Sequence, residues 1–277
     1  MPSSPPEPKS PELDPTARSF GTEATRYDRA RPRYPEALVQ RIAATSPGPD
    51  LLDVGTGTGI VARQFRAAGC RVLGVEVDAR MADLARLSGI ETEVAEFEEW
   101  DPAGRAFDAV VSAQAWHWVD PVAGAAKAAQ ALRPGGRLAL FWNVFQPPPE
   151  VTEAFTEVHD RVLPDIPNLW TRPALDTYSP LFAEAADGIR QTGGAFAEAE
   201  EWRYEWQHPY TRDEWLDLLP THGRTNGLAP ARLTELLTAT GAAIDALGGE
   251  FTVGYTTVAI TASRTTDVAS RPRSARP

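Results

Sequence analysis

The sequence has little of several residue types that restrict where a protein works. It contains one cysteine, Cys70, in 277 residues, which excludes an internal disulfide framework and favours a reducing compartment. No apolar run approaches the ~20 residues that a membrane span requires. The N-terminus also has no basic-then-apolar signal segment. We therefore expect a cytoplasmic protein without a membrane partner.

Positive charge is also scarce. Lys and Arg number 27 against 38 Asp and Glu, which gives a formal net charge of -11. This balance argues against a nucleic-acid partner, because phosphate binding needs a basic face. The histidines are widely spread and lack the spacing of metal ligands; they are His117, His159, His208 and His222. We expect no metal and no nucleic acid, and either a monomer or a homodimer.

What the sequence does contain is an alternation of strand-like and helical segments. Apolar runs typical of strands occupy 50–57, 71–77, 92–97, 107–114 and 137–145. Helical spacing fills the intervals at 60–69, 78–89 and 121–133. Repeated β-α-β units of this kind predict an α/β fold with a doubly wound, Rossmann-like, mostly parallel sheet.

The pattern changes after Gln146, where three prolines follow. Two further strands at 200–207 and 251–262, with helices at 211–219 and 230–247 between them, bring the expected sheet to seven strands. The predicted division is a disordered tail at 1–18, a core at 19–146, a helical substrate cap at 147–199, closing strands and helices at 200–264, and a second disordered tail at 265–277.

A glycine-rich loop carries the main functional signal. Asp53-Val54-Gly55-Thr56-Gly57-Thr58-Gly59 lies between a predicted strand and a predicted helix, where glycines permit a tight turn and close approach of a ligand. The dinucleotide pattern G-x-G-x-x-G is not met, because its third glycine position is Ile60. A carboxylate at Asp53 would oppose a pyrophosphate and favours a ligand that is positively charged there.

A second carboxylate, Glu76, ends the next predicted strand about twenty residues beyond the first glycine. A carboxylate at this place can accept hydrogen bonds from both hydroxyls of a ribose. Asp78 could do the same, but we interpret it as the N-cap of the following helix. Glu76 is therefore the preferred ribose ligand.

These motifs together resemble a known family. DVGTGTG, GVEVDARM, AEFEEWDPAGRAFDAVVSAQAWHWVD and LRPGGRLAL resemble, in order and spacing, the class I methyltransferases of the small-molecule type (methyltransferase type 11), which use S-adenosylmethionine (SAM). The segment FGTEATRYDRARPRYP resembles the opening helix of the same group. SAM carries a sulfonium and an ammonium, so the resemblance agrees with the charge of Asp53.

The resemblance implies roles for individual residues. Asp53 would lie beneath the loop and Glu76 would hold the ribose. The other residues expected at the cofactor are Tyr27, Arg31, Gly55, Thr56, Gly57, Gly59, Val77, Met81, Glu96, Phe97 and Gln114. Many relatives have an Asp one residue before Glu96, whereas this sequence has Ala95. The contact to the adenine amino group is then expected to pass to the Phe97 backbone.

Methyl transfer needs alignment, exclusion of water and sometimes removal of a proton. His117 lies beyond the fourth strand, at the edge where open α/β sheets bind ligands, and it is a candidate base or orienting group. A structural hydrogen bond to Asp120 is the alternative interpretation. His222 is a second acid/base candidate. The expected acceptor-binding residues are Trp116, His117, Trp142, Asn143, Trp170 and Tyr178.

The most favoured function is methylation of a small aromatic or apolar acceptor at O, N or C, with S-adenosylhomocysteine as the other product. Arg172, Arg203 and Arg224 keep a carboxylated acceptor possible. A SAM-binding protein without methyl transfer would share the same loop, and an NAD-dependent oxidoreductase is a weaker alternative. A nucleic-acid amino-methyltransferase would need an N/D-P-P-Y/F motif where this chain has Ser112-Ala113-Gln114-Ala115.

Overall fold

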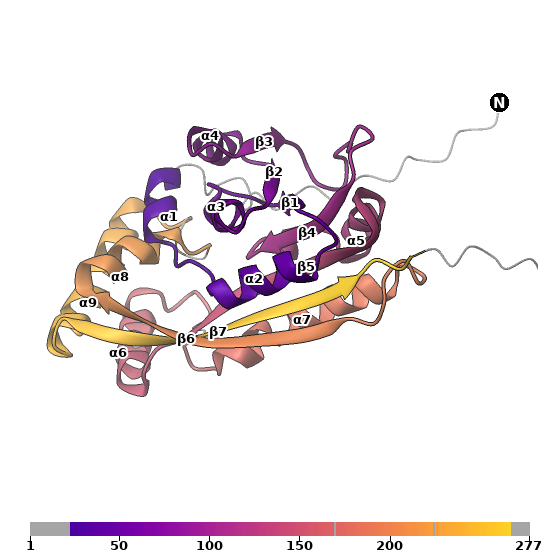
Figure 1. The fold of residues 1–277 in the computed structure, drawn as a ribbon. Helices are drawn as coiled ribbons and strands as arrows, with labels where there is room; N and C mark the ends of the chain where they lie inside the picture. The colour runs from indigo at the N-terminus through magenta and orange to yellow at the C-terminus, as the bar shows by residue number, and fades with distance from the viewer. Residues whose placement is uncertain (1–22, 169, 224, 226, 267–277) are drawn as a thin grey trace, which may run out of the picture.

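The computed structural model describes residues 23–168, 170–223, 225 and 227–266. The predicted tail at 1–18 and nearly all of the predicted tail at 265–277 lie outside these residues. One mixed sheet has the strand order β3-β2-β1-β4-β5-β7-β6 (Figure 1). The strands are β1 (Asp50–Val54), β2 (Arg71–Glu76), β3 (Glu91–Val94), β4 (Phe107–Ala113), β5 (Leu132–Gln146), β6 (Glu200–Thr211) and β7 (Glu250–Ser263).

The first five strands are parallel, while β7 runs antiparallel to β5 and β6 runs antiparallel to β7. The predicted seven-stranded, doubly wound α/β sheet is therefore confirmed. Strand β3 is shorter than expected and ends at Val94, so Glu96 and Phe97 follow it in a turn. Strand β6 continues to Thr211, four residues beyond the predicted end, because it pairs with β7 along its whole length.

Helices connect the strands and cover the sheet. They are α1 (Ala24–Ala30), α2 (Glu36–Thr45), α3 (Ile60–Ala67), α4 (Ala79–Leu87), α5 (Pro121–Ala131), α6 (Pro149–Val162), α7 (Ala174–Arg190), α8 (Arg212–Leu218) and α9 (Pro230–Ala246), with two 3₁₀ helices, η3 (Trp116–Trp118) and η4 (Leu219–Thr221). No helix among the described residues is both long and apolar enough to cross a membrane.

The two faces of the sheet have separate cores. Helices α2 and α3 cover one face, where Ile42 and Phe65 pack against Leu51. Helices α5 and α7 cover the other, where Phe182 and Ile189 of α7 join the core beneath the sheet. Strands buried on both faces explain why the parallel segments read as continuous apolar runs.

The two helices of the inserted segment before β6 pack against different parts of the molecule. Helix α7 packs against α5 and the sheet, whereas α6 packs against α9. Figure 1 shows α1, α6, α8 and α9 gathered at one end of the molecule, beside the long ends of β6 and β7. These helices enclose a cavity at the carboxyl edge of the parallel strands, where α/β sheets bind ligands.

Candidate functional site

A cavity of about 1150 Å³ extends from the loop after β1 to helices α6, α8 and α9. We call its first part the glycine-loop compartment, lined by Tyr27, Gly55, Gly57, Glu76, Met81 and Glu96. We call its second part the aromatic compartment, lined by Phe145, Phe155, Trp170, Tyr178, Trp215 and Leu236. Arg31, Gln114 and His222 border both this cavity and a side pocket of about 60 Å³ that reaches the glycine loop.

The glycines of the loop have different tasks. Gly55, Gly57 and Gly59 all have positive φ, between 57° and 85°, a conformation that glycine adopts at little cost. A Cβ on Gly55 would lie 2.4 Å from Cβ of Ala115. Gly59 precedes α3 and faces α4, where Ala85 would be 3.4 Å from its Cβ. Gly55 and Gly57 therefore line the cavity, while Gly59 serves the turn and the packing of α4.

Two buried carboxylates lie beneath and beside this loop. Asp53 is fully buried; one of its oxygens accepts a 2.6 Å hydrogen bond from Thr56, and the other, Oδ1, has no partner among the described residues. Burial, with a smaller contribution from Glu76, raises the pKa of Asp53 to about 7, although the Thr56 hydroxyl opposes the rise. An unpartnered carboxylate oxygen in such a place favours a ligand that brings positive charge.

Glu76 is held by backbone amides. Its two oxygens accept hydrogen bonds from the amides of Gly57, at 2.7 Å, and Asp78, at 3.0 Å. Burial raises its pKa, and these amides oppose the rise. Each carboxylate oxygen retains a second lone pair, so both can still accept hydroxyl donors. Asp78 accepts the amide of Arg80 as the N-cap of α4, as predicted.

Helix α1 is tied over the loop. Asp28 accepts hydrogen bonds of 2.6 Å from the Thr58 hydroxyl and from the Arg63 guanidinium. Arg31 follows the helix and donates to the backbone oxygen of Thr221, at 2.5 Å. The Nε atom of Arg31 is buried and has no partner among the described residues, so this guanidinium retains a donor for an anionic group. Pattern reading missed Asp28 and Arg63, because an acidic–basic pair separated by 35 positions gives no local signal.

His117 lies in η3, directly after β4. Its Nδ1 accepts a 3.4 Å hydrogen bond from the indole N–H of Trp142, which places the ring proton on Nε2. Burial lowers the pKa of His117 to about 4, so the ring is neutral near pH 7. In the free protein His117 thus offers a hydrogen-bond donor at Nε2. This arrangement favours the orienting role over the base role.

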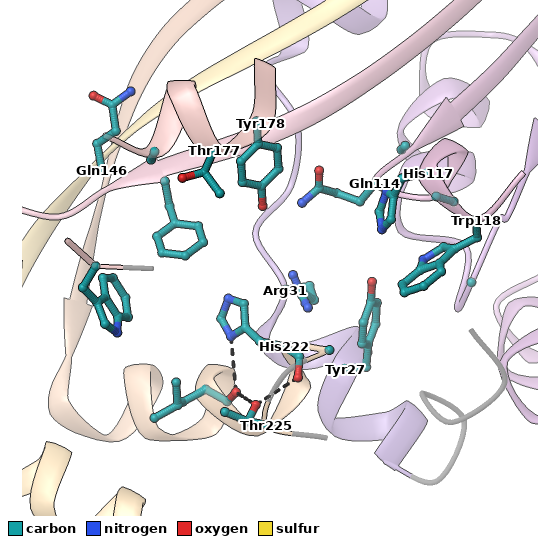
Figure 2. Close-up of a pocket in the computed structure, with 18 of the residues that line it drawn as sticks. Tyr27, Arg31, Gln114, His117, Trp118, Gln146, Thr177, Tyr178, His222 and Thr225 are labelled. Carbon is teal, nitrogen blue, oxygen red and sulfur yellow. Dashed lines mark hydrogen bonds between the residues drawn. The ribbon is translucent and has the colours of Figure 1, made fainter. Parts of the chain in front are cut away.

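His222 follows η4 on the opposite wall of the cavity. Its Nδ1 lies 3.2 Å from the carbonyl oxygen of Leu219, and Figure 2 shows its ring projecting into the space that Tyr178 and Gln114 also face. Burial and the charge of Arg31 lower the pKa of His222 to about 3, against a smaller opposing effect of the Leu219 carbonyl. Two neutral histidines, separated by 105 positions, therefore line one cavity.

The structure places most of the predicted site residues on the cavity wall: Tyr27, Arg31, Gly55, Gly57, Glu76, Val77, Met81, Glu96, Gln114, His117, Trp170, Tyr178 and His222. Thr56 and Asn143 border the side pocket. The others face elsewhere. Phe97 and Trp116 pack together in the core with ring centroids 6.1 Å apart. Trp142 is 1% exposed and contacts the cavity-lining His117 through its indole N–H.

Two tryptophans flank His117 in η3, where an aromatic wall is expected; Trp118 lines the cavity and Trp116 does not. Three further aromatic lining residues were not predicted. Phe145, Phe155 and Trp215 come from β5, α6 and α8 and meet only in the folded chain. Apolar spacing on a helix does not distinguish a cavity wall from a core. Among the described residues, no three His, Cys, Asp or Glu side chains form a group that could hold a metal ion.

This sheet order and carboxylate-bearing glycine loop define a class I SAM-dependent methyltransferase fold, and comparison with known proteins gives the family. Residues 27–178 match a methyltransferase domain family, and the chain belongs to it. A solved structure from Anaeromyxobacter dehalogenans, described as a type II methyltransferase, is similar with a TM-score of 0.59 and 25% identity over 84% of this chain and 97% of that one.

Curated relatives agree with this assignment. An uncharacterized methyltransferase of Mycobacterium bovis is 37% identical over 127 residues, which are 45% of this chain and 52% of the relative. The chain thus aligns with about half the length of the mycobacterial relatives. A malonyl-[acyl-carrier protein] O-methyltransferase of Enterobacter lignolyticus is 29% identical over 64% of this chain and 77% of its own.

Proposed function

We propose that this protein transfers a methyl group from SAM to a small organic acceptor held in the aromatic compartment. The observation that carries the proposal is the continuity of the cavity, which joins a carboxylate-bearing glycine loop to an aromatic chamber. Its volume of about 1150 Å³ exceeds the roughly 300–1,000 Å³ of sites that hold one drug-sized ligand. Two ligands can therefore occupy it together.

The residues of the glycine-loop compartment fit SAM. Gly55 and Gly57 allow the nucleoside to approach the backbone, and Glu76 would accept its ribose hydroxyls. Val77 and Met81 offer apolar flanks to a purine ring. Asp53 has an oxygen without a partner, and its negative charge would offset the positive charge of the cofactor through the loop.

The methionine end of the cofactor would meet a positively charged group. Arg31 has a buried donor without a partner, which suits the methionine carboxylate. SAM supplies a methyl group activated by a sulfonium leaving group. The protein contributes alignment, a dry site and hydrogen bonds at the acceptor. Helix α1 closes the glycine-loop compartment through its Asp28 contacts.

Aromatic and aliphatic lining indicates a flat or apolar acceptor, and Nε2 of His117 would orient it. The direct test is incubation of the full chain with trideuteromethyl-SAM and a panel of apolar phenols, amines and carboxylic acids, followed by mass spectrometry. Gain of one labelled methyl group, reduced in Glu76→Gln at limiting SAM, supports the function. SAM binding without any labelled product across the panel would favour a SAM-binding protein that does not transfer methyl groups.

A further inference from the structure

The aromatic compartment combines large size with little internal charge. Rings from three of its elements meet at Trp215: this ring of α8 lies 5.5 Å from Phe155 of α6 and 6.4 Å from Phe145 of β5, between ring centroids. Glu153 and Arg172, which also line the cavity, are exposed, and half-buried Arg31 borders the aromatic compartment beside His222. An apolar chamber with charge confined to its edges suits an uncharged, mainly apolar molecule.

The hydrogen bonds of His222, on this wall, determine which of its ring nitrogens carries the proton. The Leu219 carbonyl oxygen can only accept, so Nδ1 of His222 must be the donor in their 3.2 Å contact. The Thr225 hydroxyl, at 2.6 Å, and the backbone amide of His222, at 3.2 Å, also donate to this oxygen. With the proton on Nδ1, the lone pair of the neutral ring is on Nε2. His222 therefore presents a hydrogen-bond acceptor, and Figure 2 shows the ring facing the cavity.

His117, on the opposite wall of the cavity, has the reverse hydrogen-bonding pattern. Trp142 donates to Nδ1 of His117, so the lone pair of that ring is already used and its Nε2 carries a proton. A ligand hydroxyl can donate a hydrogen bond to Nε2 of His222, but it cannot donate one to Nε2 of His117. Burial of a polar ligand group is tolerated only where such a partner exists.

We propose that the aromatic compartment binds an uncharged apolar acceptor that carries a hydroxyl, and that this hydroxyl donates a hydrogen bond to Nε2 of His222. The inference rests on the proposed methyl-transfer function, because it names the acceptor class of the same site. No proton is transferred in this contact: the ring is buried and lies in the field of Arg31, so a second proton on it is opposed. His222 acts as a recognition and alignment group.

The first test reads the tautomers directly in the full chain labelled with ¹⁵N-histidine. Long-range ¹H–¹⁵N spectra distinguish an Nδ1-protonated ring from an Nε2-protonated ring, and single-histidine variants assign the signals. We expect the Nδ1-protonated form for His222 and the Nε2-protonated form for His117 near pH 7. An Nε2-protonated or doubly protonated His222 would overturn the proposal without any need for a substrate.

The second test uses three probes of similar shape, β-naphthol, its methyl ether and β-naphthoate, titrated in the presence of saturating S-adenosylhomocysteine. We expect β-naphthol to bind roughly tenfold more tightly than the ether, the worth of one hydrogen bond to a buried acceptor. β-Naphthol should also shift the Nε2 resonance of His222. In His222→Phe the preference for β-naphthol should vanish while affinity for S-adenosylhomocysteine stays. His208→Phe, at an exposed position on β6, is the control and should retain the preference.

The outcomes separate this inference from the function beneath it. Equal affinity for β-naphthol and its ether, or no binding of any probe by a protein that binds S-adenosylhomocysteine, overturns the inference and leaves the function standing. Tightest binding of β-naphthoate also overturns it and points to Arg31 or Arg172 as the acceptor anchor. Failure to bind S-adenosylhomocysteine at all removes the proposed function itself. The tautomer measurement on the unmodified chain stands even if His222→Phe does not fold.

Discussion

Replacement of Asp53 by Asn should stabilise the free protein while it weakens cofactor binding. Asp53 is fully buried, and its pKa is raised from an ordinary 3.8 to about 7 mainly by that burial. The folded state therefore holds a proton that the unfolded state has released between about pH 4 and pH 7. Stability falls as the pH rises through this window and levels off above it.

The size of the effect follows from the same values. A difference of about three pKa units corresponds to roughly 4 kcal/mol of unfolding free energy at neutral pH and above. The neutral amide avoids this cost, so Asp53→Asn should raise the melting temperature above pH 7 by roughly 5 °C or more. Between acidic and neutral pH, the stability of the variant should also fall much less than that of the wild type.

Differential scanning calorimetry across this pH range, with and without S-adenosylhomocysteine and SAM, is the assay. The variant should melt higher than the wild type without ligand and gain less from SAM, because the negative charge that would offset the positive charge of the cofactor is lost. Glu157→Gln, an exposed change from carboxylate to amide on α6, is the control and should leave the profile unchanged. A variant no more stable than the wild type above neutral pH would refute the reasoning.

Three further changes test other parts of the site and fold. Glu76→Gln should weaken S-adenosylhomocysteine binding by roughly tenfold or more in calorimetric titration, since the ribose loses a charged acceptor. Gly55→Ala should abolish that binding, because its Cβ would lie 2.4 Å from a neighbouring Cβ; Gly69→Ala, also at positive φ (+92°) but in open space, should retain it. Gly188→Ala should lower the unfolding free energy by roughly 1–3 kcal/mol in urea titration, since its Cβ would meet the Pro121 oxygen at 2.2 Å. Unchanged values would contradict each prediction.

Local chain chemistry predicted the parallel half of the fold well. Apolar runs that end in glycine or in a capping residue such as Asp78 define strand and helix boundaries without tertiary information. The carboxylates Asp53 and Glu76 were recognised because their charge at a strand end opposes one ligand class and suits another. Both are buried against the glycine loop, where they were expected.

The sequence did not predict which side chains point into the cavity and which point into the core. Trp116 and Trp118 are two residues apart in one 3₁₀ turn, yet the first is in the core and the second lines the cavity. The sequence contains no signal for that choice, because it depends on the packing of Phe97 beneath the turn. The pairing of His117 with Trp142 has the same origin: adjacent strands β4 and β5 bring them together.

The central claim is that the glycine-loop compartment binds SAM. Calorimetric titration of the full chain with S-adenosylhomocysteine and, separately, with NAD tests it most directly. The account predicts saturable binding of one S-adenosylhomocysteine per chain and none of NAD, because the Asp53 carboxylate opposes a pyrophosphate at this loop. Binding of NAD without binding of S-adenosylhomocysteine would contradict the assignment of the site.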